Sequence, residues 1–114
     1  MRSLAVPDTE AVAVEPKNVM AYPGNLTALH NQIGKTFYIR VTGGPGGSVW
    51  GADVYTSDST LATAAVHAGA VQAGQTAVVR VTIVAPPNGF QGSTRNGVTS
   101  MPFPNYPGAY KVSK

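Results

Sequence analysis

Residues 47–69 read GSVWGADVYTSDSTLATAAVHAG, and this stretch joins a strand pattern directly to a short alanine-rich helix. Apolar residues alternate with other residues from Val49 to Tyr55, which is the pattern of a strand with one buried face. We expect this strand to place Trp50 on one face and Asp53 and Tyr55 on the other. The stretch therefore predicts a strand that runs into a helix through a short turn.

The helix is expected to start near Ser59, directly after Asp58. The carboxylate of Asp58 can accept hydrogen bonds from the first free amides of a helix, and its charge complements the helix dipole. Small side chains follow on nearly every turn up to Gly69, which can adopt the left-handed conformation that often ends a helix. Because small side chains let strands approach the helix axis closely, the pattern predicts a short helix enclosed by sheet.

Further patterns predict the rest of the sheet. Residues 36–42 alternate as a half-buried strand, and the glycine-rich run 43–47 predicts a wide hairpin turn into the strand that follows it. The β-branched run 76–84 predicts the central strand. Asn96-Gly97 is a strong two-residue hairpin signal, and residues 110–112 are expected to close the sheet as an edge strand.

Two motifs resemble the core of the LCCL domain: VWGADVYTSDS at residues 49–59 and AAVHAG at residues 64–69. The likeness continues at three further places, GKTFY at residues 34–38, VVRVTI at residues 78–83 and STRNG at residues 93–97. The resemblance thus covers about residues 25–112.

This resemblance implies an α+β, predominantly β fold, in which a short central α-helix is wrapped by antiparallel β-strands. It also implies an accessory module of larger extracellular proteins, which is credited with binding ligands, including lipopolysaccharide, and has no catalytic residues. Structural roles are expected for Trp50, Asp53, Tyr55, Asp58, His67, Gly69, Asn96 and Gly97.

The absence of cysteine separates this chain from the animal members of that family, which carry disulfides. Leu61 stands where one of those cysteines would fall. The chain therefore resembles a cysteine-free member of bacterial or phage type, and the functions of animal members are not carried over. Without cysteine, disulfide scaffolds and zinc–thiolate sites are excluded.

The composition indicates an unusual surface. Only 11% of the 114 residues are charged, whereas glycine and proline together contribute 22 residues. Such a weakly charged surface suits burial against other subunits, or contact with neutral polymers such as glycans.

Residues 1–24 are expected to form an extended arm, and residues 25–114 the LCCL-like domain. Prolines interrupt the arm at three places, so it can extend or add an edge strand but cannot form a core. Residues 1–17 carry a net charge of −1 and the remainder carries +4, which invites the arm of one copy to lie on the body of another. The basic positions of the body are scattered singly along the sequence, so nucleic-acid binding is not expected.

The residues that could carry catalysis are few, and we expect no enzyme activity. Asp53, His67 and a neighbouring serine could be imagined as a triad, but no nucleophile elbow accompanies them. His67 is expected instead to hold helix against sheet through a bond to a backbone carbonyl or to Asp53. The two histidines are 37 positions apart and no carboxylate cluster accompanies them, so neither a metal nor another cofactor is expected.

No apolar run is long enough to span a membrane, and the residues after Met1 lack the apolar core of a secretory signal. A location in a virion, at a cell surface or outside the cell fits the two functions that remain open. The first is a structural protein assembled in many copies into a larger particle, such as a phage capsid decoration or tail component. The second is a module that binds a bacterial glycan or lipopolysaccharide.

Three aromatic residues of the proline-rich C-terminal segment are the expected binding residues: Phe103, Tyr106 and Tyr110. Prolines stiffen this segment, so it can present rings for stacking on sugars or for insertion into a partner's pocket. We therefore expect protein subunits, most simply further copies of this chain, or a cell-surface glycan as the partner.

Overall fold

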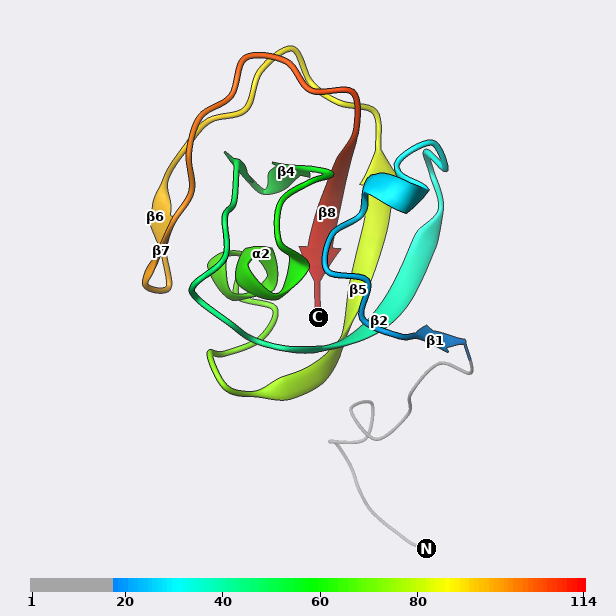
Figure 1. Cartoon of the computed structure of the whole chain (residues 1–114), viewed down its shortest axis with the longest axis vertical. Coiled ribbons are helices and arrows are strands. Elements are labelled where there is room, and N and C mark those ends of the chain that lie inside the picture. The colour runs from blue at the N-terminus through cyan, green and yellow to red at the C-terminus, as the bar shows by residue number, and fades with distance from the viewer. Residues whose placement is uncertain (1–17) are drawn as a thin grey trace, which may run out of the picture.

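The computed structural model describes residues 18–114 (Figure 1). In chain order the elements are β1 (Val19–Met20), η1 (Thr27–Leu29), β2 (Thr36–Thr42), β3 (Gly51–Ala52), β4 (Val54–Thr56), α2 (Leu61–His67), β5 (Thr76–Val84), β6 (Thr94–Arg95), β7 (Val98–Thr99) and β8 (Ala109–Ser113). The expected α+β, predominantly β architecture with one short α-helix is confirmed.

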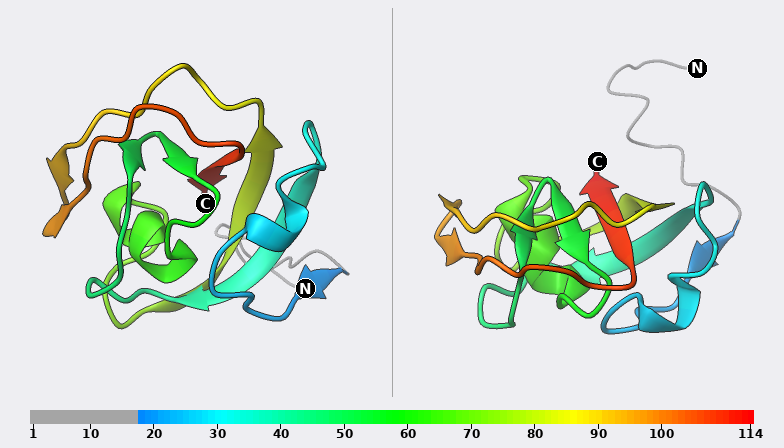
Figure 2. Two further views of the ribbon diagram at one scale, coloured as in Figure 1. Left: turned by 45° about the horizontal axis from the view of Figure 1, so that its top comes forward. Right: turned by 90° about the horizontal axis from the view of Figure 1, so that it is seen from above.

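The main sheet has six strands in the order β1-β2-β5-β8-β4-β3. Strand β1 runs parallel to β2, and every other neighbouring pair is antiparallel. The β-branched strand β5 lies between β2 and β8, as its nearly continuous apolar sequence predicts. Figure 2 shows how the sheet curves around α2.

The hydrophobic core lies between α2 and the concave face of the sheet. Small residues on α2, Ala64 and Ala65, are fully buried, as are Tyr55 on β4 and Tyr110 on β8. The small helical side chains leave room for the two tyrosine rings, whose centroids are 5.9 Å apart. The helix ends before Gly69, which has the positive φ of 80° expected of a helix-terminating glycine.

The strand predicted over residues 49–55 is wrong, because the chain reverses within it. Asp53 has a φ of 69°, and β3 and β4 pair antiparallel on either side of it, with Ala52 opposite Val54. Alternation of apolar residues could not reveal this turn, because aspartate tolerates the left-handed conformation without any sequence marker such as glycine or proline at that position.

The predicted hairpin turn at residues 43–47 is also wrong. Strand β2 pairs with β5 and β1, and the glycine-rich run crosses instead over the first turn of α2. The amide of Gly47 donates to the hydroxyl of Thr63, which in turn donates to the carbonyl oxygen of Gly44. Glycine suits position 47 of this crossing, because a side chain there would collide with Thr60 and Thr63.

Asp58 does not cap the helix, and the helix starts at Leu61 rather than near Ser59. The first amides of α2 have other partners: the amide of Leu61 donates to the carbonyl oxygen of Gly24, and the amide of Ala62 donates to the hydroxyl of Tyr22. These groups come from a segment distant in sequence, so a side-chain cap is not needed. One carboxylate oxygen of Asp58 is buried without a hydrogen-bond partner in the described part of the chain.

Strand β8 is not the edge strand that residues 110–112 were expected to form. It lies inside the sheet, paired with β5 on one side and with β4 on the other. The hairpin at Asn96-Gly97 is confirmed, because β6 and β7 pair antiparallel across it and both turn residues have positive φ angles.

Most of the predicted arm, residues 1–17, lies outside the described residues. Residues 18–24 lie against the domain, since β1 pairs with Tyr38 and Ile39 of β2 and Gly24 accepts the bond from the start of α2. The boundary between arm and domain after Gly24 stays a prediction.

We expect Gly51→Ala to destabilise the fold by roughly 2–4 kcal/mol. Gly51 has a φ of 106°, and an added methyl group would collide with the carbonyl oxygen of Val54. Gly46→Ala is the matched control, since no atom lies within 4 Å of the added methyl group. Urea unfolding of both variants measures the difference, and similar losses in the two would contradict the strained turn.

Candidate functional site

The ribbon, residues 88–104, is the long connection between β5 and β8. Its two antiparallel segments run side by side from β5 and β8 to the β6–β7 hairpin (Figure 1). Backbone bonds of 2.8 and 3.0 Å join Phe90 to Phe103, and further backbone bonds join Met101 to Val49 and Gly51 of the domain. The ribbon is therefore tied to the domain along one side.

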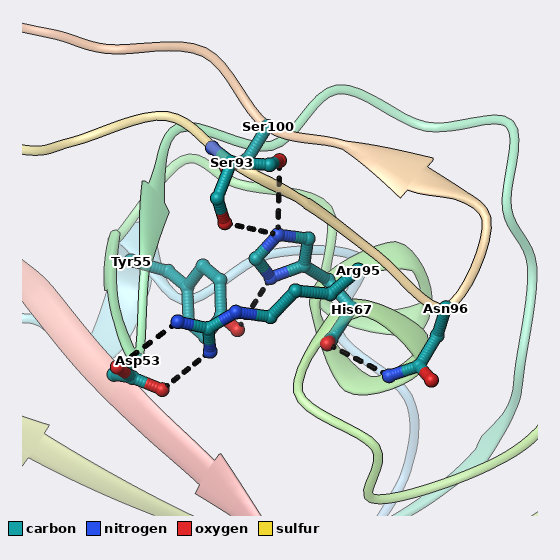
Figure 3. Close-up of polar contacts among 7 residues, drawn as sticks. All are labelled: Asp53, Tyr55, His67, Ser93, Arg95, Asn96 and Ser100. Atoms are coloured by element: carbon teal, nitrogen blue, oxygen red, sulfur yellow. Dashed lines mark hydrogen bonds and ion pairs between the residues drawn. The ribbon is translucent and has the colours of Figure 1, made fainter.

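The imidazole of His67 connects α2 to both β4 and the ribbon (Figure 3). Its Nδ1 lies 2.9 Å from the hydroxyl of Tyr55, and its Nε2 lies 3.2 Å from the carbonyl oxygen and 3.1 Å from the hydroxyl of Ser93. A carbonyl oxygen can only accept, so Nε2 carries the proton and Nδ1 accepts from Tyr55. The side chain of His67 is fully buried, and both of its nitrogens have partners.

Two more contacts hold the tip of the ribbon, and both are drawn in Figure 3. The side-chain amide of Asn96 donates a hydrogen bond of 3.1 Å to the backbone carbonyl oxygen of His67. The guanidinium of Arg95 contacts the carboxylate of Asp53 at 2.6 and 3.4 Å. We call the contacts of His67, Asn96 and Arg95 the clasp, because they join the ribbon to α2 and to the β3–β4 turn.

Burial and hydrogen bonding set the protonation states of the residues at the clasp. Burial acts on His67 and Tyr55. It lowers the pKa of His67, whose neutral form is therefore favoured, and it raises the pKa of Tyr55 to about 12. The hydrogen bond from Arg95 lowers the pKa of Asp53, so this carboxylate stays charged. Because the Asp53–Arg95 pair is exposed to solvent, it contributes little to stability.

The clasp does not assemble the triad that the sequence suggested. Asp53 pairs with Arg95, and Tyr55 occupies the Nδ1 side of His67 where a triad carboxylate would lie. The hydroxyl of Ser93 faces Nε2, but that nitrogen carries its proton for the Ser93 carbonyl and so cannot act as a base toward the hydroxyl. In this geometry the side chains join β4, α2 and the ribbon to one another.

Residues 18–114 contain no group of three or more side chains suited to holding a metal ion. Within the same range, no helix is long and apolar enough to cross a membrane.

The predicted binding residues fall into two classes. Phe103 is 36% exposed on the ribbon, and the ring of Tyr106 packs edge-on against it at 5.8 Å between centroids. The prediction that Tyr110 is a contact residue is wrong. Its side chain is fully buried, and its hydroxyl donates to the carbonyl oxygen of Ser59. Its place in an internal strand turns the ring into the core, which the sequence of an expected edge strand could not show.

Sequence reasoning missed Met101, which is 54% exposed beside Phe103. Phe103 also lines an open hollow of about 620 Å³, whose other lining residues are Asn88, Gly89, Phe90, Gln91, Pro102 and Pro104. The alternation of large apolar residues with prolines in MPFP at residues 101–104 was the available signal. The ribbon thus presents apolar side chains and an apolar hollow on one surface.

Trp50 and Tyr55 have different environments although both were expected to be structural. Tyr55 is fully buried, whereas Trp50 is half-buried and its amide donates to the hydroxyl of Ser59. The same hydroxyl lies 2.8 Å from that of Thr56, so it joins β3, β4 and the start of α2.

We expect stability to fall as the pH is lowered from 7 to 5. The pKa of His67 in the folded domain lies below 6.5, so the unfolded chain takes up the proton first. The contribution of neutral His67 is complete above about pH 6.5 and is lost as the pH falls toward the folded pKa, with a slope of at most ~1.4 kcal/mol per pH unit. Urea unfolding at several pH values measures this slope. His67→Gln should flatten it, and an equal slope in that variant would assign the titration to another group.

His67→Ala should cost ~1–3 kcal/mol at pH 7.5, because it leaves the buried Tyr55 hydroxyl and the Ser93 carbonyl without partners. Asp53→Ala, which breaks only the exposed ion pair, should lower the stability less than His67→Ala does. Thermal unfolding of the two variants gives the comparison, and the reverse order would place the main connection of the ribbon at Arg95.

Two comparisons with known proteins bear on this architecture. Residues 26–109 match the model of the LCCL domain family. The chain is also 42% identical to vitrin from Bos taurus over 67 residues, which make up 58% of this chain and 10% of vitrin. It therefore spans about a tenth of the length of that relative. With most of its residues matched to the family model, and with a short helix enclosed by strands, the chain belongs to the LCCL domain family.

Proposed function

We propose that this LCCL domain is a non-catalytic interaction module that docks into a larger assembly through its ribbon. The supporting observation is that the ribbon exposes two large apolar side chains, Met101 at 54% and Phe103 at 36%, and that Phe103 also lines an open apolar hollow. Exposed apolar side chains gathered beside a hollow are typical of interaction sites on soluble domains.

The ribbon has a fixed conformation before any partner binds. Backbone bonds of Met101 and the clasp at His67 hold it against the domain, and backbone bonds between Phe90 and Phe103 join its two segments. The prolines at positions 102 and 104 limit the conformations that would be lost on binding, so the entropic cost of docking is small. A flexible methionine beside a rigid aromatic ring lets the surface adapt to a partner's pocket.

The partner in this proposal is protein, and its simplest form is a further copy of this chain. A many-copy particle, such as a phage capsid or tail to which a cysteine-free LCCL domain of bacterial or phage type contributes, fits the low charge content of 11%. In such a setting the domain would act in a virion or at a cell surface. The second function, glycan binding, is favoured by a different surface, the outer face of the main sheet.

We expect the double variant Met101→Ala/Phe103→Ala to lose association while its melting temperature stays within a few degrees of the wild type. Both side chains are exposed. Their truncation therefore removes area that would contact the partner and leaves the core unchanged. Native mass spectrometry and sedimentation of the full chain measure the association. The control is Ile33→Ala, which removes a side chain that is 57% exposed and lies outside the ribbon.

A wild-type chain that stays monomeric at its highest soluble concentration would contradict self-assembly. Association that survives in the double variant, or that is lost equally in Ile33→Ala, would contradict the ribbon as its site.

A further inference from the structure

Three cations that are distant in sequence lie on one diagonal of the main sheet. On β5, Arg80 is two positions from Thr82, which is opposite Lys111 of β8. On the other side, Arg80 is opposite Tyr38 of β2, two positions from Arg40. The diagonal therefore runs Lys111–Arg80–Arg40 across β8, β5 and β2.

All three cations are on the outer face of the sheet. Along β2, β5 and β8 the buried residues alternate with exposed ones, and Lys111, Arg80 and Arg40 occupy exposed positions. Diagonal neighbours on adjacent antiparallel strands are about 7–8 Å apart, so the three Cα atoms span about 15 Å. The sequence suggested scattered single charges, and the strand register brings these into a line.

No carboxylate of residues 18–114 lies on these three strands. The acidic residues of that range are Asp53, which pairs with Arg95, and Asp58. Arg40 has an interaction of its own within the chain. The positive charge that a ligand would meet on this face is therefore that of Arg80 and Lys111. The outer face is thus a surface with a line of cations across it.

Hydroxyl groups surround this line. The side chains of Thr36 and Thr82 are hydrogen-bonded at 3.1 Å, and those of Thr42 and Thr76 at 2.7 Å. In each pair one hydroxyl donates to the other, which leaves one proton free to donate outward and acceptor lone pairs on both oxygens. These groups can hydrogen-bond the hydroxyls of a sugar ring on either side of the cations.

We propose that the outer face of β2, β5 and β8 binds an extended acidic polysaccharide, whose carboxylate or sulfate groups follow the diagonal and whose hydroxyls meet the threonine pairs. Charge complementarity selects an anionic ligand, and cations aligned along one diagonal select a linear one. This proposal refines the glycan-binding alternative. It does not depend on docking through the ribbon, whose exposed residues lie outside these strands.

Other anionic partners fit the face less well. A protein interface needs buried aromatic or apolar anchors, but the outward positions of these strands carry mainly threonine, serine and cations. Single-stranded nucleic acid needs rings for base stacking, and Tyr38 alone offers one here, half-buried. Insertion into a membrane needs an apolar patch, which the outward side chains do not provide.

The test measures binding of the full chain to heparin and to polygalacturonate, with neutral dextran, single-stranded DNA and anionic vesicles as alternatives. The variant is Arg80→Gln/Lys111→Gln. The matched control is Lys35→Gln/Lys114→Gln, which also removes two positive charges, but at positions outside the diagonal. Thermal unfolding checks that both remain folded, as expected for exposed side chains.

We expect at least one of the two acidic polysaccharides to bind, and the diagonal variant to weaken that binding at least tenfold while the control weakens it less than threefold. Added salt should weaken wild-type binding more steeply than that of the diagonal variant, because fewer charges remain to be screened. Met101→Ala/Phe103→Ala should bind the polysaccharide as the wild type does, which separates this site from the ribbon.

Three results would overturn the proposal. These are no binding to either acidic polysaccharide, equal weakening in the diagonal and control variants, or tighter binding to DNA, vesicles or dextran than to both acidic polysaccharides.

Discussion

The burial of one neutral imidazole is the constraint on which the arrangement of this domain depends. His67 is fully buried where α2, β4 and the ribbon meet, and each of its nitrogens has a partner on a different element. An unsatisfied buried polar group costs about 1–3 kcal/mol, so the three elements keep the positions that supply those partners. The ribbon, which contributes little to the core apart from Phe90 and Val98, is held by this side chain together with the backbone bonds of Met101 to the domain.

The helix that carries His67 depends on the surrounding chain in turn. With seven residues, α2 is too short to be stable alone, because helix nucleation is costly and few bonds repay it. Gly24 and Tyr22 satisfy its first amides from outside, and Tyr110 donates to Ser59 just before it. The segment that holds the helix thus precedes it by about forty residues, and β8 follows it by about the same distance. This explains why α2 forms without a side-chain cap at its N-terminus.

The sequence predicted what neighbouring residues determine and missed what distant residues determine. The alternation over residues 36–42, the β-branched run 76–84 and the pair Asn96-Gly97 predicted β2, β5 and the hairpin, because each carries its own preference for backbone conformation. Asp58 and Tyr110 were misjudged because their environments are made by partners far along the chain. Within the candidate site, Phe103 was found exposed as expected, whereas the exposure of Met101 and the partners of His67 required the three-dimensional packing. The diagonal of cations was missed for the same reason, since only strand register aligns Lys111 with Arg80.

The two proposed surfaces respond to different conditions because they are held by different parts of the fold. Contact through Met101 and Phe103 removes apolar area from water and is insensitive to salt, but it needs a ribbon fixed by neutral His67. Arg80 and Lys111 belong to the central strands of the sheet and keep their register whether or not the ribbon is fixed. Ligands on that face are screened by salt but not released by loss of the clasp. Mild acid should therefore loosen the ribbon partner first, while the sheet face, whose two cations stay charged, keeps its ligand.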